Sequence, residues 1–397
     1  MRISTANAFE NTLDTLMRRQ VEMVRTQEQL TSGKRVNRSS DDPAAAARAE
    51  RALAVEARST ATQRGVDASL NAMTLTESAL GDASELLQQA REALVAAGNA
   101  TYSDAEREGL AHKLTNLRAQ LLQVANRSDG AGNYLFGGQG VTQAPFLDAP
   151  GGVVFRGVVG ALQAASGEAL PLTIDGQRAW MDARTGNGVF ETAATVSTGS
   201  AWIDSGTVTD PSAINGSTYA IQFTVSGGTT TYSVLQDGSP TAMTNVPFTP
   251  GRAIEIDGRS ATITGDPANG DEFTLAPSQP GLSVFDVVDE AIAGLNTPLR
   301  TGSQIAQANT RTLTGIDAVL NQLQAARSQV GETLSRIDHV TDRLADVKLS
   351  AQTARSDAED LDMVQALSDF QNRQTGYDAA LKSYSMVQKL SLFNYLG

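Results

Sequence analysis

The sequence predicts a mainly α-helical protein that carries an inserted antiparallel β domain. Residues 141–281 hold 10 of the 12 prolines, both tryptophans and 19 of the 35 glycines of the 397-residue chain, and contain no lysine. The flanking segments are nearly free of proline, and their apolar residues recur alternately every three and four positions. This order favours a middle β domain between two helical arms that meet in space.

The composition excludes several classes of function. The chain has no cysteine, so disulfides, thiolate catalysis and Cys-ligated metals are ruled out. Its two histidines, His112 and His339, leave no His-His metal motif, and a net charge of −13 argues against a nucleic-acid-binding surface. No apolar run approaches the roughly 18 residues of a membrane span. The N-terminus lacks an apolar signal region, so we expect no cleaved signal peptide.

Residues 1–40 are predicted to form a coiled-coil helix. A narrow apolar stripe with alternating spacing of four and three is typical of a coiled-coil seam rather than of a globular helix face. Gly33 ends this helix, and a polar loop follows that includes Lys34, Arg35 and Asn37. The predicted seam comprises Phe9, Leu13, Leu16, Gln20, Met23, Gln27 and Leu30.

Residues 41–140 and 282–356 are predicted to form the two halves of a helical bundle domain. Asp41, Asp42 and Pro43 have the residue types that start a helix, with acids at its positive end and proline in its first turn. Ser103 and Glu106 have the spacing of a capping box. A short helix is expected near 283–295, capped by Ser283. The longer seams run through Val66, Leu70, Met73, Glu77, Leu80, Ser84, Leu87, Arg91 and Leu94, and from Leu313 to Leu344.

Residues 357–397 are predicted to form a second coiled-coil helix that pairs with the first. Both terminal seams contain glutamines and hold few leucines for the ordering cost of their backbone. We therefore expect residues 1–40 and about 357–397 to be disordered in the free monomer and to fold on each other and on neighbouring subunits. The second seam comprises Met363, Leu367, Phe370, Gln374, Tyr377, Leu381, Tyr384 and Gln388.

The middle of the chain is predicted to form a β-hairpin extension of the bundle (141–190) and an outer antiparallel β domain (191–281). Short strand candidates alternate with turn dipeptides such as Gly227-Gly228 and Asp257-Gly258. Asp175-Gly176 is interpreted as a further hairpin turn. The strand candidates are Gly152–Phe155, Leu170–Ile174, Tyr219–Val225, Thr230–Leu235, Ala253–Ile256, Ala261–Thr264 and Glu272–Leu275.

The residues offer little material for catalysis, and we expect no enzyme activity and no cofactor. The acidic segment 266–272 lacks the alternating ligand spacing of a calcium loop, so a plain turn is favoured. Asp360 and Asp362 diverge on a helix, which favours a helix start or a solvated face over a catalytic pair. No phosphate-binding or hydrolase motif is present.

The segment Leu30-Thr-Ser-Gly-Lys-Arg-Val-Asn37, continuing through Asp41-Asp42-Pro43-Ala44, resembles the bacterial flagellin signature. The opening Arg2-Ile-Ser-Thr5 and the tail Ser391-Leu-Phe-Asn-Tyr-Leu396 are more similar to the hook-associated members of that family than to flagellin. So are Glu359-Asp-Leu-Asp362, Asn133-Tyr-Leu-Phe-Gly-Gly138 and Pro267-Ala-Asn-Gly-Asp-Glu-Phe273. The likeness spans the chain, strongly at both ends and loosely in the middle.

The resemblance implies a flagellin-like fold and a structural role in the flagellum. Its terminal helices would pair in an innermost coiled-coil layer of a ring that joins the hook, through the first junction protein, to the flagellin filament. Export would proceed unfolded through the flagellar type III apparatus to the cell exterior. A cytoplasmic chaperone would hold the C-terminal segment with Leu392, Phe393, Tyr395 and Leu396. We further hypothesise that the loop around Lys34–Asp42 provides sliding contacts between subunits.

Two alternatives stay open at this point. Flagellin itself shares the N-terminal signature, although its tail normally ends differently. An extracellular module that binds glycans or a host surface would use Trp180 and Trp202 as stacking residues, but tryptophans in such a domain are more often core.

Overall fold

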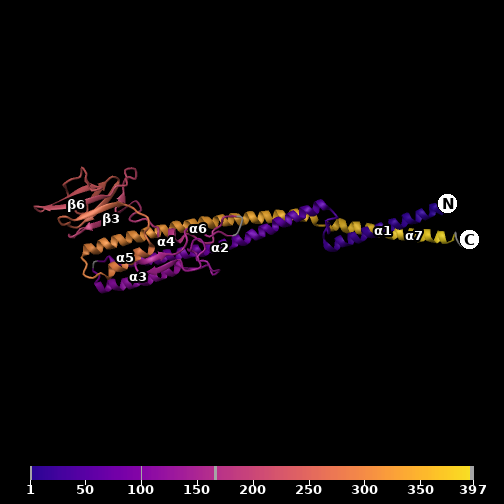
Figure 1. Ribbon diagram of the computed structural model, residues 1–397, viewed down its shortest axis with the longest axis horizontal. Coiled ribbons are helices and arrows are strands. Elements are labelled where there is room, and N and C mark those ends of the chain that lie inside the picture. The colour runs from indigo at the N-terminus through magenta and orange to yellow at the C-terminus, as the bar shows by residue number, and fades with distance from the viewer. Residues whose placement is uncertain (1, 100, 165–167, 394–397) are drawn as a thin grey trace. The chain divides into compact units, whose positions relative to one another are not determined.

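The computed structural model describes residues 2–99, 101–164 and 168–393, with side chains described from residue 10 to residue 386 of these ranges (Figure 1). The chain folds as two compact units, Met1–Arg64 with Val340–Gly397 and Gly65–His339. The division falls inside the two longest helices, α2 (Pro43–Ala97) and α6 (Gly302–Glu359), whereas the sequence analysis set limits at residues 40 and 357. Periodicity could not locate this division because each helix continues unbroken through both units.

The first unit contains the paired terminal helices α1 (Arg2–Ser32) and α7 (Met363–Phe393). It also contains the first part of α2 and the last part of α6, which are joined by Ser59 Oγ donating to the Leu344 carbonyl at 3.2 Å. A half-buried ion pair between Arg355 Nη1 and Glu56 Oε2, 2.9 Å apart, adds a second link between these helices. The disorder expected for the terminal segments of the free monomer stays a prediction.

The helices of the second unit begin where the capping residues predict. In α3 (Asp104–Ala125), Ser103 and Glu106 form the expected capping box, and Ser283 caps α5 (Val284–Asn296). Along α2 the predicted seam residues Val66, Met73, Leu80, Leu87 and Leu94 are buried, while Leu70 is exposed. The charged seam residues Arg91 and Glu77 form ion pairs with α6, Arg91 with Asp317 and Glu77 with Arg327.

An aromatic cluster anchors the hairpin extension to the bundle. The hairpin consists of β1 (Phe146–Ala149) and β2 (Gly152–Phe155), and the short helix α4 (Gly176–Trp180) follows it. The fully buried Trp180 ring stacks on Phe285 at 5.9 Å and meets Phe136 edge-on. The hairpin thus shares a core with α5 of the helical bundle.

Two predictions for this region were wrong. Residues 170–174 form no strand. Their backbone groups make single hydrogen bonds to separate segments of the chain, for example from the Ile174 N–H to the Leu135 carbonyl. Asp175 does not make a hairpin turn. Its carboxylate accepts from the Arg178 N–H and caps α4, a role for which aspartate is equally suited.

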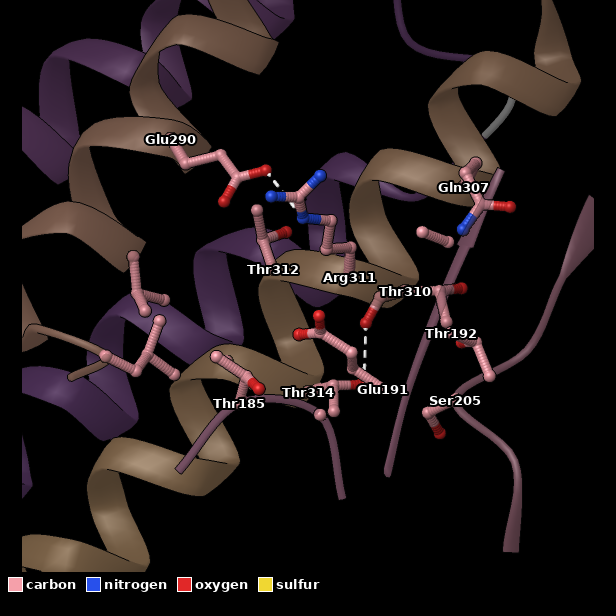
Figure 2. A pocket seen from close by; sticks show the side chains of 15 residues that line it. Thr185, Glu191, Thr192, Ser205, Glu290, Gln307, Thr310, Arg311, Thr312 and Thr314 are labelled. Atoms are coloured by element: carbon pink, nitrogen blue, oxygen red, sulfur yellow. Dashed lines mark hydrogen bonds and ion pairs between the residues drawn. The ribbon is translucent and has the colours of Figure 1, made fainter. Parts of the chain in front are cut away.

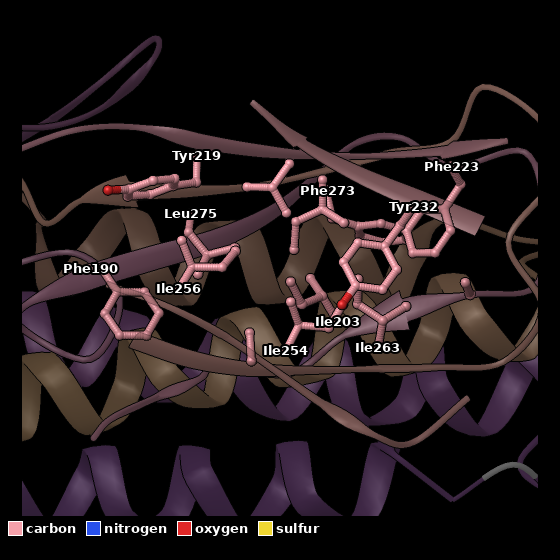
Figure 3. Packing of buried hydrophobic residues seen from close by; sticks show 14 residues of the cluster. Phe190, Ile203, Tyr219, Phe223, Tyr232, Ile254, Ile256, Ile263, Phe273 and Leu275 are labelled. Atoms are coloured by element: carbon pink, nitrogen blue, oxygen red, sulfur yellow. The ribbon is translucent and has the colours of Figure 1, made fainter. Parts of the chain in front are cut away.

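The inserted β domain consists of two antiparallel sheets that enclose one hydrophobic core (Figure 3). One sheet has the order β3-β12-β6-β7-β8 with β9 beside β7, and the other has the order β10-β11-β4 with β5 beside β11. Phe190, Ile221, Phe223, Ile263 and Phe273 are among the buried residues between them. Their strands are β3 (Phe190–Val196), β4 (Trp202–Ile203), β5 (Thr207–Val208), β6 (Tyr219–Ser226), β7 (Thr229–Gln236), β8 (Ser239–Pro240), β9 (Val246–Pro247), β10 (Ala253–Ile256), β11 (Arg259–Thr264) and β12 (Glu272–Pro277).

Apart from residues 170–174, the predicted strands are confirmed. The turn dipeptides lie between the strands they were expected to separate, and Asp257 and Gly258 both adopt positive φ there. Alternation of buried and half-buried residues along β11 and β12 explains the success, because each strand presents one face to the core.

Candidate assembly surface

The two terminal helices form an antiparallel pair. Near one end of the pair the Leu361 N–H donates to the Gly33 carbonyl at 3.0 Å. Further along, the Arg373 guanidinium lies 3.8 Å from the Glu22 carboxylate. Between these two contacts the residue number falls along α1 and rises along α7, so the helices run antiparallel. The start of α1 therefore lies beside the end of α7 (Figure 1).

The contact face of α1 is rotated from the predicted seam. Leu16 is buried and Met23 and Leu30 are half-buried, as a seam requires. Thr26, however, is buried while Gln27 is exposed, and Leu13 is 39% exposed. The side chain of Phe9 lies outside the described residues. The helix therefore uses every second predicted position against its partner and leaves the others uncovered.

Helix α7 is rotated in the same way. Phe370, Tyr377 and Tyr384 are half-buried, as predicted. Ala366 is buried in place of Leu367, which is 52% exposed, and Leu381 is 40% exposed. Met363 is exposed as well. Small residues allow the close approach, since a Cβ atom at Gly376 would stand only 2.4 Å from Arg19 Nη1.

The uncovered seam positions of both helices lie on the same side of the pair. In each helix an uncovered position follows a covered position by one residue. This step turns the side chain by about 100° around the helix axis, always in the same direction. Because the helices run antiparallel, equal rotations turn both sets toward one side. The apolar side of the pair, as we call it, comprises Leu13, Met17 and Val24 of α1 and Met363, Val364, Leu367 and Leu381 of α7, all exposed.

The polar loop after α1 is fastened to the junction between α6 and α7. The Arg35 N–H donates to the Glu359 carbonyl at 2.7 Å, and Arg35 Nη2 donates to the Ala358 carbonyl at 2.7 Å. Arg35 Nη1 also lies 3.2 Å from the Asp42 carboxylate, and Lys34 Nζ lies 3.2 Å from Glu359. We call residues 33–43 with 358–362 the elbow. Gly33 adopts φ +71°, a left-handed conformation that glycine favours.

Two aspartates of the elbow hold backbone N–H groups. Asp41 Oδ2 accepts from the N–H groups of Arg38 and Asn37, and these bonds lower the pKa of Asp41. Asp42 Oδ1 accepts from the Ala45 N–H at the start of α2, where Pro43 is the first helical residue. That bond and the Arg35 guanidinium lower the pKa of Asp42. Both carboxylates are therefore charged at neutral pH. Asp42 caps α2, as predicted, whereas Asp41 does not cap the helix and instead closes the loop that precedes it.

The remaining acidic residues that the sequence singled out also have structural roles. Asp362 Oδ1 accepts from the N–H groups of Val364 and Gln365 and caps α7. Asp360 pairs with Lys34 in an isolated β-bridge of the elbow. The sequence did not indicate that Arg35 links three segments, because its partners at Ala358 and Glu359 are more than 300 residues away.

The C-terminal residues expected to contact a chaperone lie largely outside the described part of the chain. Leu392 and Phe393 belong to the last turn of α7, and their side chains are not described. Tyr395 and Leu396 lie outside the described residues altogether.

The acidic segment 266–272 is a turn held by one buried carboxylate. Asp271 is completely buried, and its Oδ1 accepts from the Thr198 N–H and hydroxyl at 2.7 and 2.8 Å. Its Oδ2 accepts from the N–H groups of Gly199 and Ala268. Both oxygens are thus saturated by donors, which is incompatible with calcium ligation by this carboxylate.

A cavity of about 170 Å³ lies between β3 of the inserted domain and helices α5 and α6 (Figure 2). Two of its charged groups, Glu290 and Arg311, pair with each other at 3.0 Å. Glu191 also lines the cavity, and most of the other labelled side chains are threonines. No cluster of metal-ligating side chains occurs in the described ranges. Across these same ranges, no helix is both long and apolar enough to cross a bilayer.

The tryptophans do not support glycan stacking. Trp180 is fully buried in the helical part of the second unit, outside the β domain. Trp202 lies in the short strand β4 and is half-buried. A stacking platform needs exposed aromatic faces, so the structure disfavours a glycan-binding module built on these two residues.

Comparison with known proteins places the helical arms in one family. The model of the bacterial flagellin N-terminal helical region matches residues 3–140, and that of the C-terminal helical region matches residues 313–396. Together these matches cover more than half of the chain. The chain therefore belongs to the bacterial flagellin family.

Within this family, the similarity extends over full length to one type of member. Flagellar hook-associated protein 3 of Escherichia coli K12 is 26% identical, with 99% of each chain covered. The crystal structure of hook-associated protein 3 from Legionella pneumophila has a TM-score of 0.70 at 26% identity and covers 77% of this chain and 96% of its own. Polar flagellin C of Vibrio parahaemolyticus is 23% identical over 86% of this chain and 84% of its own. These findings support a structural protein of the flagellar hook–filament junction over a filament flagellin.

Proposed function

We propose that this protein is a non-enzymatic ring subunit that joins the hook to the flagellin filament, and that α1 and α7 hold the ring together by coiled-coil packing. The observation that carries the proposal is the apolar side of the terminal helix pair. Residues such as Val24 and Leu367 are 53% and 52% exposed there, which costs solubility in an isolated chain.

Burial by neighbouring copies would complete the seam. The heptad positions that α1 and α7 leave uncovered are those that a third and a fourth helix would cover in a larger coiled-coil assembly. Because the uncovered positions of both helices lie on one side, a single neighbour can contact both helices at once. Glu22, whose carboxylate lies 3.8 Å from Arg373, is exposed on the opposite side, which suits a solvated surface.

The elbow would set the direction of the terminal pair within each subunit. Its hydrogen bonds connect the end of α1 to the end of α6, and Asp42 connects the same loop to the start of α2. Lys34, Arg35, Asp41 and Asp42 all have partners inside the chain. We therefore modify our hypothesis of sliding contacts: movement between subunits would occur on the exposed flanks of the elbow, such as Ser39 and Ser40, rather than at these four residues.

The partners follow from this role. We infer contacts with further copies of the chain, with the first junction protein on the hook side and with flagellin on the filament side. Export through the flagellar type III apparatus would place the ring outside the cell. A cytoplasmic chaperone would cover the C-terminal segment before export, since an uncovered apolar side invites premature association.

The first experiment is electron microscopy of cells that lack this chain, with flagellin assayed in the medium. Bare hooks together with shed flagellin are expected for a junction protein. Bare hooks without shed flagellin would make the chain the filament subunit, and normal filaments would contradict the proposal outright.

A matched pair of variants then tests the surface. Leu381→Asp places a charge on the apolar side and should prevent incorporation when supplied to the deletion strain, because a buried unpaired charge is strongly unfavourable. Ser383→Asp adds the same charge nearby, but this exposed residue lies on the other side of α7, so filaments should form normally. Normal incorporation of Leu381→Asp would remove α7 from the assembly surface.

A further inference from the structure

A second cavity, of about 510 Å³, lies in the helical part of the second unit, where the α5–α6 loop meets the ends of α2 and α3. Two guanidinium groups, those of Arg107 and Arg300, line it together with the amides of Gln304 and Asn309. Cations that share a cavity repel each other, so their arrangement requires an explanation.

Arg107 is buried, with only 7% of its surface exposed. Its Nη1 donates to the Tyr102 carbonyl at 2.5 Å and its Nη2 to the Asn99 carbonyl at 3.2 Å, both just beyond the end of α2. Its Nε is buried and has no hydrogen-bond partner among the described residues. Leaving a charged donor unpaired in the interior is costly, and native proteins generally avoid it.

Arg300 is held beside it by the α5–α6 loop. Arg300 Nη1 donates to the Gly294 carbonyl at 2.9 Å and Nη2 to the Gln304 carbonyl at 2.6 Å. The preceding Leu299 adopts φ +57°, which is strained for a leucine, and its N–H donates to Asp104. Burial and the nearby Arg107 charge lower the pKa of Arg300, although a guanidinium stays protonated at neutral pH.

The nearby carboxylates do not neutralise this pair of cations. Glu290 lines the cavity, but its Oε1 lies 3.0 Å from Arg311 Nε and is paired there. Asp104 is 3.9 Å from Arg107 Nη1, at the limit of an ion pair, and its side chain is half exposed. Two guanidinium groups thus share a cavity without a closely bound anion.

We propose that this cavity binds a carboxylate that carries a short hydrocarbon chain, with Arg107 and Arg300 holding the oxygens. Guanidinium groups suit planar carboxylates because their donors form a fork. The rest of the wall favours hydrocarbon over a bare inorganic ion, since it is built mainly from Leu94, Ala97, Ala291, Leu295, Ile305 and Ala308. This inference does not depend on the proposed function in the flagellum.

The test uses the full chain and sodium butyrate as the probe, with sodium chloride at equal ionic strength as the reference. For a ligand of this size we expect a Kd of roughly millimolar order, measured by calorimetry, and a shift of the Arg107 Nε–Hε resonance in ¹⁵N-arginine-labelled protein. Arg300→Gln should weaken binding at least tenfold, whereas Arg252→Gln, at an exposed position in the β domain, should leave it unchanged.

Three results would overturn the proposal. They are the absence of saturable binding, a butyrate affinity that Arg300→Gln leaves unchanged in a folded protein, and tighter binding of inorganic phosphate than of butyrate. Circular dichroism of each variant confirms folding.

The same variant identifies the source of the carboxylate. If Arg300→Gln loses butyrate binding but is incorporated normally into flagella, the site takes a free short-chain carboxylate. If it loses both, the site takes the Asp or Glu side chain of a neighbouring subunit. Either outcome supports the site itself, because both require that Arg300 binds a carboxylate.

Discussion

Truncation of the buried Asp271 should destabilise the β domain more than any surface change in it. Asp271→Ala leaves three backbone N–H groups, those of Thr198, Gly199 and Ala268, without their acceptor in the interior. Each such loss costs about 1–3 kcal/mol, and partial rescue by entering water reduces the sum. We therefore expect a loss of about 3–5 kcal/mol, which shifts a urea midpoint by roughly 2 M at an m-value of about 2 kcal/mol/M.

The two tryptophans allow this domain to be followed by itself. Trp202 lies in β4, whereas Trp180 lies in α4, so a Trp180→Phe background leaves one reporter within the β domain. Urea unfolding followed by Trp202 fluorescence then measures the effect of Asp271→Ala. Glu272→Ala is the matched control, because its carboxylate accepts only from the exposed Gln222 amide, and its effect should stay within about 0.5 kcal/mol.

The pH dependence provides an independent test. Burial alone would raise the pKa of Asp271, but the donors from Thr198, Ala268 and Gly199 outweigh it and lower the pKa in the folded state. The unfolded chain therefore binds the proton more readily, so this contribution is complete above the unfolded pKa of about 4 and is lost as the pH falls through the folded pKa. A loss below 1 kcal/mol in Asp271→Ala, or the same acid sensitivity with and without the carboxylate, would refute this reasoning.

Further predictions concern the elbow, the bundle and the terminal helices. Arg35→Gln should speed amide exchange in the loop 33–43 several-fold, whereas unchanged exchange would mean that Arg35 does not fasten the loop. Gly138→Ala should cost at least about 3 kcal/mol in thermal unfolding, because Gly138 has φ +70° and a Cβ atom there would stand 1.6 Å from the Val158 carbonyl oxygen. In the isolated chain, residues 10–32 and 363–386 should exchange far faster than the bundle core, and strong protection of both would contradict the expected disorder.

Much of the architecture was accessible from the sequence because it depends on local patterns. The capping box at Ser103 and the cap at Ser283 use side chains that bond within three residues, so spacing alone identifies them. Strands such as β10 and β12 alternate buried and exposed residues between turn dipeptides. The family signature around Gly33 and Asp41 is likewise contiguous in the chain.

The rotation of the terminal seams was beyond the sequence. When α1 is considered alone, either Thr12 or Leu13 fits the heptad spacing, and the apolar side chain favours Leu13. The outcome depends on the packing of the two helices, which buries Thr26 and Ala366 in place of Gln27 and Leu367. Leu13, Leu367 and Leu381 therefore stay exposed.

The amino-acid sequence was sufficient to predict the fold class, the inserted β domain, most of the helix caps and the family. It could do so because periodicity, capping and turn chemistry act over a few residues. Three-dimensional contacts were needed to show which seam residues stay exposed, that Arg35 joins the elbow across more than 300 residues, and that Arg107 and Arg300 share one cavity. Such contacts unite distant segments, and their energies depend on burial and charge that no local pattern contains.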